Sequence, residues 1–102
     1  MNSLPPSPGI SKEKWQRLSR FQQKVYRAIF RIPEGEVRSY QWVAKAIGQP
    51  GSARAVGQAL HVNPFAPLIP CHRVIRADGS LGGFAWGLKR KQQLLRREGY
   101  PA

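Results

Sequence analysis

Apolar residues recur at helical spacing along this chain, and the clearest run begins after Ser19. The pair Ser19-x-x-Gln22 matches a capping box, in which each residue bonds the backbone of the other at a helix start. The apolar positions that follow share one helical face: Phe21, Val25, Ala28 and Ile29. The turn-forming sequence at 33–35 then predicts the end of this helix.

Shorter elements are predicted on both sides of that helix. We expect a short helix in 10–18 and a last helix over 88–98, with Leu94 and Leu95 facing inward and Gly99 stopping it. Residues 37–38 are a candidate strand. Residues 74–76 and one or two residues near 81 predict a β-hairpin around 77–80. Residues 1–9 are rich in proline and serine, which predicts a disordered tail before a single domain over 10–102.

The middle of the chain predicts two short helices joined by a tight turn. Ser39 can cap a helix over 40–47 that Gly48 stops, and Ser52 can cap a second helix over 53–62. Such a pair is typical of a helix-turn-helix, although an αα-hairpin within a core would look the same. The predicted fold class is mostly α with a small β-hairpin, in a winged-helix-like helix-turn-helix domain.

The second of these helices carries unusually small side chains. Its small positions are Ala53, Ala55, Gly57 and Ala59, and its long ones are Arg54, Gln58 and His61. A helix that reads bases in the major groove normally presents several long polar side chains. A helix without bulk can approach a backbone closely, or enter a minor groove only about 6 Å wide if the groove is widened. Close packing against another helix is the alternative explanation.

Net charge changes this picture more than any other bulk property. The 102 residues include 17 Lys and Arg but only five Asp and Glu, which gives a formal charge of +12. Such an excess favours a polyanionic partner, most often nucleic acid, over a merely soluble basic surface. No apolar run approaches the roughly 20 residues of a membrane span. We therefore expect a nucleic-acid partner and no membrane.

The single cysteine, Cys71, is followed directly by His72. One cysteine forms no internal disulfide and no Cys-rich zinc site, which fits a reducing, intracellular compartment. A lone cysteine is more often a buried apolar residue than a nucleophile, but a nearby histidine can favour the reactive thiolate. Adjacent extended residues point apart, so contact needs a turn or an intervening water. Five acids could orient the histidine, and the sequence alone does not choose among them: Glu13, Glu34, Glu36, Asp78 and Glu98.

Several motifs together resemble one known family. They are SYQWVAKAIG (39–48), ARAVGQAL (53–60), Asn63-Pro64, IPCHRVI (69–75), GSLGGF (79–84) and LLRREG (94–99). In this order they resemble the DNA-binding and active-site domain of the 6-O-methylguanine-DNA methyltransferases, over roughly residues 19–100. The motif around Cys71 is by itself specific to that family.

The resemblance implies a role for each residue of a catalytic group. Cys71 would accept the alkyl group from the exocyclic oxygen of guanine and keep it as a thioether. His72 would deprotonate Cys71 through a water, and Glu98 would orient and polarise His72. Tyr40 would protonate the leaving guanine at a ring nitrogen. A water relay would also explain how neighbours that diverge can cooperate.

The resemblance assigns a second group to DNA and to the substrate pocket. Arg54 would fill the stack vacated by a flipped nucleotide, beside the minor-groove surface of Ser52, Ala53 and Gly57. Asn63 would link the recognition helix to the cysteine loop. The pocket and its supporting residues would include Val74, Phe84 and Trp86. Ala85 and Trp86 depart from the family, whose members often have a serine and a small residue there.

The expected function is therefore irreversible repair of 6-O-alkylguanine in double-stranded DNA, with base flipping through the minor groove. We expect a monomer that needs no metal or cofactor and works in the cytoplasm with the nucleoid, or in the nucleus. The N-terminal domain of many members is absent from the matched part. Two rivals are a damage sensor without transfer, a class that replaces the cysteine, and a sequence-specific regulator, which needs base-reading side chains.

Overall fold

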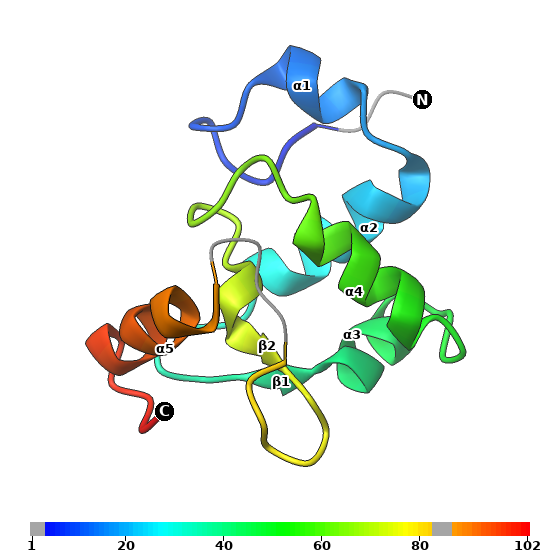
Figure 1. The fold of residues 1–102 in the computed structure, drawn as a ribbon. Coiled ribbons are helices and arrows are strands. Elements are labelled where there is room, and N and C mark those ends of the chain that lie inside the picture. The colour runs from blue at the N-terminus through cyan, green and yellow to red at the C-terminus, as the bar shows by residue number, and fades with distance from the viewer. Residues whose placement is uncertain (1–3, 83–86) are drawn as a thin grey trace.

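Helices make up most of the regular secondary structure, as a computed structural model of residues 4–82 and 87–102 shows (Figure 1). The elements follow in this order: α1 (Lys12–Gln16), α2 (Arg20–Phe30), β1 (Arg38–Ser39), α3 (Tyr40–Ala46), α4 (Ala53–His61), the 3₁₀ helix η1 (Cys71–Arg73), β2 (Val74–Ile75) and α5 (Leu88–Arg97). None of the helices in the described ranges is long and apolar enough to cross a membrane. The mostly helical fold class predicted from the sequence is confirmed.

Helix α2 begins at the capping box that the sequence predicts. The Ser19 hydroxyl accepts a hydrogen bond from the Gln22 backbone N–H at 3.1 Å, and the Gln22 side chain accepts one from the Ser19 N–H at 2.9 Å. These bonds satisfy donors that a helix start leaves unpaired. The helix then buries Val25, Tyr26 and Ile29. Its inner face thereby becomes the centre of the core.

Helices α3 and α4 form the helix-turn-helix pair, and α2 packs against both of them. The Ser39 hydroxyl caps α3 by accepting a hydrogen bond from the Trp42 N–H at 3.0 Å. Gly48 follows α3 with a φ of 78°, a left-handed conformation that glycine adopts without strain. The predicted cap of α4 is wrong in detail, because the Ser52 hydroxyl donates to the Gln49 carbonyl instead and makes no cap bond.

The predicted β-hairpin is also wrong. Strand β2 pairs in parallel with β1, with Arg38 opposite Val74 and Ser39 opposite Ile75. A turn does follow β2, because the Arg76 N–H donates to the Ser80 carbonyl at 2.9 Å. The return arm forms no strand in the described part, where the Leu81 carbonyl accepts a hydrogen bond from the Lys91 side chain. A side chain thus takes the place of the predicted partner strand.

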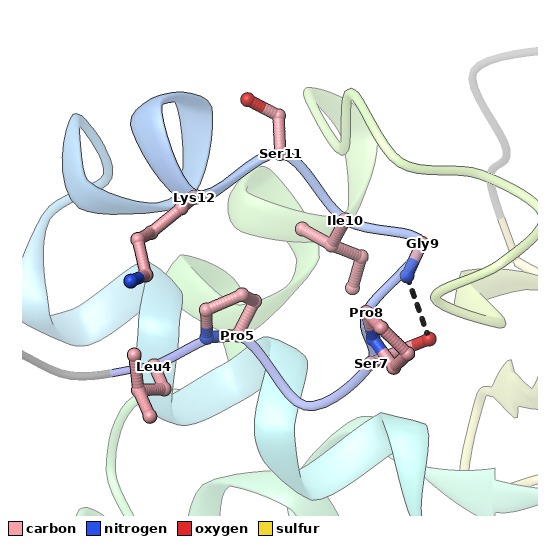
Figure 2. A pocket seen from close by; sticks show the side chains of 8 residues that line it. All are labelled: Leu4, Pro5, Ser7, Pro8, Gly9, Ile10, Ser11 and Lys12. Carbon is pink, nitrogen blue, oxygen red and sulfur yellow. Dashed lines mark hydrogen bonds between the residues drawn. The ribbon is translucent and has the colours of Figure 1, made fainter.

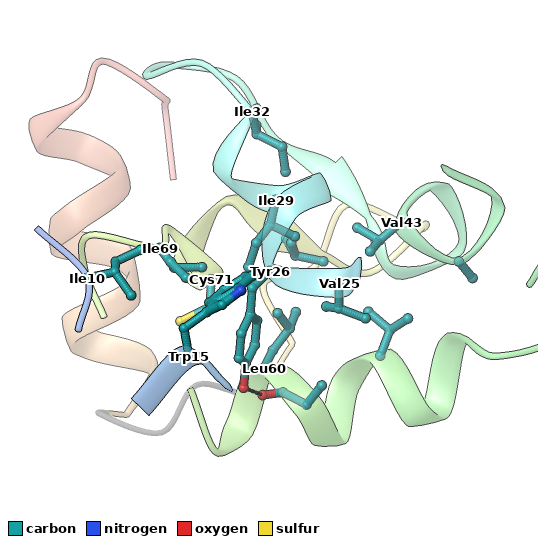
Figure 3. Close-up of a cluster of buried hydrophobic side chains, with 14 residues drawn as sticks. Ile10, Trp15, Val25, Tyr26, Ile29, Ile32, Val43, Leu60, Ile69 and Cys71 are labelled. Carbon is teal, nitrogen blue, oxygen red and sulfur yellow. Dashed lines mark hydrogen bonds between the residues drawn. The ribbon is translucent and has the colours of Figure 1, made fainter. Parts of the chain in front are cut away.

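The core includes the single cysteine. Cys71 belongs to the same buried cluster as Trp15, Tyr26 and Ile69 (Figure 3). The Tyr26 hydroxyl donates to the Ala59 carbonyl at 2.6 Å, which ties α2 to α4 within this cluster. The segment around η1 is therefore held from behind by tightly packed apolar side chains.

The N-terminal segment lies against this core. Trp15 is fully buried, and its ring centroid is 6.3 Å from that of Phe65. Residues 4–5 and 7–12 line an open hollow of about 700 Å³, which contains none of the predicted site residues (Figure 2). The Arg27 guanidinium donates to the Leu4 carbonyl. The division into a tail over 1–9 and a domain over 10–102 stays a prediction.

Candidate active site and nucleic-acid interface

The thiol of Cys71 is placed by a short turn at the end of a proline-rich loop. The Cys71 N–H donates to the Ile69 carbonyl at 2.8 Å, and the Arg73 N–H donates to the Pro70 carbonyl at 2.9 Å. Only 3% of Cys71 is exposed. Burial raises the pKa of the Cys71 thiol, and a hydrogen bond from Asn63 and the charge of Lys91 only partly offset this. The resting group is therefore a thiol that needs a base.

His72 is bonded to the acid that the resemblance names. His72 Nε2 lies 3.0 Å from Glu98 Oε2, and 1% of the His72 side chain is exposed. Glu98 is the residue that caps the C-terminal end of α5, which packs against η1. Among the five acids that the sequence offers, the structure thus places Glu98 beside the histidine.

Arg73 completes this arrangement. Its Nε donates to Glu98 Oε1 at 2.9 Å, and its terminal nitrogen donates to Glu98 Oε2 at 2.7 Å. Its other terminal nitrogen donates to the Ile32 carbonyl at 2.7 Å. A two-pronged guanidinium–carboxylate contact of this kind fixes both orientation and charge. Arg73 therefore holds the carboxylate in the direction of His72.

The electrostatics of this group keep His72 neutral and therefore available to accept a proton. Burial lowers the pKa of His72, against the opposing effects of the Glu98 hydrogen bond and charge, so the imidazole is neutral at neutral pH. Burial acts to raise the pKa of Glu98, but the hydrogen bonds from Arg73 and His72 outweigh it, and the net shift is downward. A neutral base next to an ionised carboxylate can take up a proton, and the carboxylate then stabilises the imidazolium.

Cys71 and His72 are consecutive residues of η1. Successive side chains of a 3₁₀ helix leave the axis roughly 120° apart, since the helix has about three residues per turn. The thiol joins the apolar cluster, whereas the imidazole faces Glu98. This divergence favours a relayed proton transfer between them over direct contact.

Asn63 connects the recognition helix to the cysteine loop. Its amide nitrogen donates to the Ile69 carbonyl at 3.0 Å, and its side-chain oxygen accepts from the Phe65 N–H at 2.9 Å. It also makes a hydrogen bond with Cys71 that favours the thiolate. Asn63 therefore ties the end of α4 to the loop that carries the thiol.

Tyr40 begins α3 and lies against the loop that follows β2. Burial raises the pKa of its phenol, the charge of Arg76 lowers it and a negative Cys71 raises it, with a net upward shift. The phenol is therefore protonated at neutral pH and able to donate. A Cβ atom added to Gly82 would lie 2.9 Å from the Tyr40 hydroxyl oxygen. Only a glycine fits there.

Arg54, on the exposed side of α4, borders an open depression of about 430 Å³. The other residues that line it are Tyr40, Gln41, Ala53, Gly57 and Arg76. Ala53 and Gly57 are half-buried in this depression and have small side chains or none. A Cβ atom added to Gly57 would lie 3.8 Å from the Tyr40 ring, so Tyr40 packs against this face of α4. The structure thus brings Ala53, Arg54, Gly57 and Tyr40 together, with Ser52 at the start of the same helix.

Of the three remaining predicted pocket residues, the structure describes only Val74. Val74 is fully buried in β2, directly after η1. Phe84 and Trp86 lie outside the described residues. Within the described ranges, no cluster of three His, Cys, Asp or Glu side chains could hold a metal ion.

Sequence reasoning missed three residues that the structure brings to this site. Arg73 holds Glu98, Gly82 makes room for Tyr40, and Lys91 lies buried next to β2. Arg73 and Gly82 stand inside the motifs that carry the resemblance, so those motifs were the signal available. Lys91 had no such signal, since a lysine in an amphipathic helix is usually exposed.

Comparison with known proteins agrees with this geometry. A profile of the DNA binding domain of 6-O-methylguanine DNA methyltransferase matches residues 20–100. A methylated-DNA–protein-cysteine methyltransferase of Mycolicibacterium paratuberculosis is 56% identical over 82 residues, covering 80% of this chain and 50% of its own length.

Two solved structures extend the comparison. The Mycobacterium tuberculosis OGT in complex with DNA superposes with a TM-score of 0.80 at 52% identity, covering 81% of this chain and 51% of that chain. The S. pombe Atl1 in complex with damaged DNA containing O6-carboxymethylguanine gives a TM-score of 0.73 at 36% identity, covering 81% and 79%. The chain spans about half the length of the methyltransferases. Its buried Cys-His pair, its helix-turn-helix and its matched sequence make it a member of the 6-O-methylguanine DNA methyltransferase family.

Proposed function

We propose that this chain repairs 6-O-alkylguanine in double-stranded DNA by transferring the alkyl group irreversibly to Cys71. One observation carries the proposal. The single thiol lies buried next to His72, whose imidazole is bonded at 3.0 Å to Glu98. This is the arrangement that a thiol with a raised pKa needs in order to become a nucleophile.

The residues of the site can account for every bond and proton in the proposed alkyl transfer. His72 takes the thiol proton through a water, and the Cys71 sulfur attacks the alkyl carbon in line. A carbon–sulfur bond forms while the bond between that carbon and the guanine oxygen breaks. The electron pair stays on guanine, which takes a proton at a ring nitrogen from Tyr40, and the proton on His72 restores Tyr40. A thioether does not release its alkyl group, so each molecule acts once.

The guanine must leave the base stack before the thiol can reach it, at a cost of a few kcal/mol. We propose that the small surface of α4, at Ser52, Ala53 and Gly57, enters the minor groove. Arg54 would then fill the gap left by the flipped nucleotide. The exposure of Arg54 beside the depression that contains Tyr40 supports this assignment. The formal charge of +12 favours binding to any duplex through its phosphates.

A damage sensor that binds alkylguanine without transfer is the second candidate. The similarity to S. pombe Atl1, of which this chain covers 79%, is the observation that favours it. Such sensors replace the acceptor cysteine, whereas this chain retains Cys71 with a base and an acid aligned behind it. We therefore place transfer ahead of sensing.

An assay with labelled DNA separates the two candidates. A duplex with a radiolabelled methyl group on guanine O6 is incubated with the protein, and protein and DNA are then separated. Transfer predicts that the label moves to the protein at no more than one equivalent. The Cys71→Ser variant should still bind the methylated duplex but acquire no label. A wild-type protein that binds the duplex and leaves all label on the DNA would establish the sensor.

A further inference from the structure

Lys91 is a buried lysine for which the proposed reaction has so far no use. It lies in the middle of α5, and none of its surface is exposed. Burying an ammonium group is costly unless the surroundings compensate for the lost water. A lysine retained in such a place therefore needs a reason in the packing or in the chemistry.

Two carbonyl oxygens hold the ammonium group. Lys91 Nζ donates to the Val74 carbonyl at 2.7 Å and also to the Leu81 carbonyl. Val74 follows the Cys71 turn directly, and Leu81 lies just before Gly82, the residue that contacts Tyr40. Lys91 therefore links β2, which follows the Cys71 turn, to the segment at Leu81, which precedes the glycine beside Tyr40.

The same group places a charge among the reacting side chains. Lys91 Nζ lies 6.0 Å from the centre of the Tyr40 ring. Its charge lowers the pKa of both Cys71 and His72. Burial lowers the pKa of Lys91 to about 8, with a negative Cys71 acting upward and Arg76 acting downward. The ammonium is therefore the predominant form at neutral pH.

We propose that Lys91 is a positioning residue of the transfer reaction: its ammonium group ties β2 to Leu81 and holds a positive charge at the strand that follows the Cys71 turn, 6.0 Å from the centre of the Tyr40 ring, where it favours the thiolate. A thiolate on Cys71 is attracted by the charge of Lys91 and is stabilised by it when His72 removes the proton. This role deepens the proposed function and rests on Cys71 being the acceptor.

The test uses iodoacetamide, which alkylates thiolates without DNA. The rate of Cys71 alkylation is measured against pH in the wild type and in Lys91→Met. The variant should react about tenfold more slowly at neutral pH, where Lys91 is charged in the wild type. Lys91→Arg, which keeps the charge, should restore most of this rate. Because DNA is not involved, this result stands apart from the success or failure of methyl transfer.

Lys89→Met is the matched control. It removes one charge from an exposed position of the same helix, and its alkylation profile should match that of the wild type. A folded Lys91→Met protein with the wild-type rate at neutral pH would overturn the proposal. So would an equal loss of rate in Lys89→Met, because net charge would then explain the effect.

If Lys91→Met does not fold, the wild-type lysine gives the answer. Loss of the Lys91 charge near pH 8 should flatten the rise of the wild-type alkylation rate with pH in that range, because the thiol is then harder to ionise. A rate that rises tenfold per pH unit through this range would contradict the proposal.

Discussion

His72 Nε2 lies 3.0 Å from Oε2 of Glu98, although the two residues are 26 positions apart in the sequence. The contact joins the first turn after the cysteine loop to the last turn of α5. Arg73 holds the same carboxylate from the other side at 2.7 Å. Glu98 thus orients the proposed base, His72, and also joins the end of α5 to η1.

Glu98→Gln should weaken both activity and stability. The amide cannot stabilise an imidazolium on His72, so methyl transfer should slow by about 10- to 100-fold while binding to duplex DNA changes little. Loss of the charge-assisted bonds to Arg73 should lower the free energy of unfolding by about 1–3 kcal/mol. Single-turnover kinetics and urea unfolding measure the two effects.

The pH dependence of stability gives an independent check on Glu98. Its pKa is lower in the folded than in the unfolded protein, so its stabilisation is present above about pH 4.5 and is lost as the pH falls through the folded pKa. The stability difference between wild type and Glu98→Gln should therefore narrow in acid. A difference that stays constant down to pH 3 would show that the carboxylate charge does not stabilise the fold.

Gly82→Ala should impair transfer by displacing Tyr40. The added Cβ atom would lie 2.9 Å from the phenol oxygen, whereas in Gly79→Ala it would meet nothing within 4 Å. Both glycines have positive φ, so both variants should lose about 1 kcal/mol of stability through backbone strain. Only Gly82→Ala should also lose transfer rate. Equal rates in the two variants would place Tyr40 outside the reaction.

Arg54→Ala should separate base extrusion from chemistry. Reaction with methylguanine in a duplex should fall by about tenfold or more, whereas reaction with the free alkylated base should be nearly unchanged, because only the duplex requires extrusion. Binding should weaken steeply with salt and depend little on sequence. A strongly preferred site in a binding-selection experiment would instead support a sequence-specific regulator.

Trp86→Gly should widen the range of alkyl groups accepted. By resemblance, Trp86 belongs to the loop that closes over the flipped base, and an indole there would occupy space that a bulky substituent needs. The wild type should therefore repair methylguanine efficiently and benzylguanine poorly, and the variant should improve only the benzyl reaction. Equal benzyl-to-methyl rate ratios in the two proteins would remove Trp86 from the pocket.

Most of the helix ends that depend on local rules were predictable from the sequence, although the cap at Ser52 was not. The capping box at Ser19, the cap at Ser39 and the glycine stop at Gly99 depend on neighbouring residues, and all three are present. Choosing Glu98 among five acids required the resemblance, because no local signal links α5 to His72. The same limit applies to every contact between distant segments.

The parallel pairing of β1 with β2 was missed for this reason. A strand of two residues carries almost no sequence pattern. The residue that pairs with Val74 of β2 is Arg38 of β1, which lies 36 positions earlier. Lys91 was missed because a helical lysine is normally exposed, and the Val74 and Leu81 carbonyls that help to offset the cost of its burial come from distant parts of the sequence. Both depend on the assembled fold.

The central claim is that Cys71 is the alkyl acceptor. The most direct test is the mass of the intact protein, and of its peptides, after incubation with a duplex containing 6-O-methylguanine. We predict a gain of one CH₂ group per molecule, located on the peptide that contains Cys71, with no second addition when the duplex is in excess. An unchanged mass after the protein has bound the methylated duplex, or an adduct on any other residue, would contradict the account.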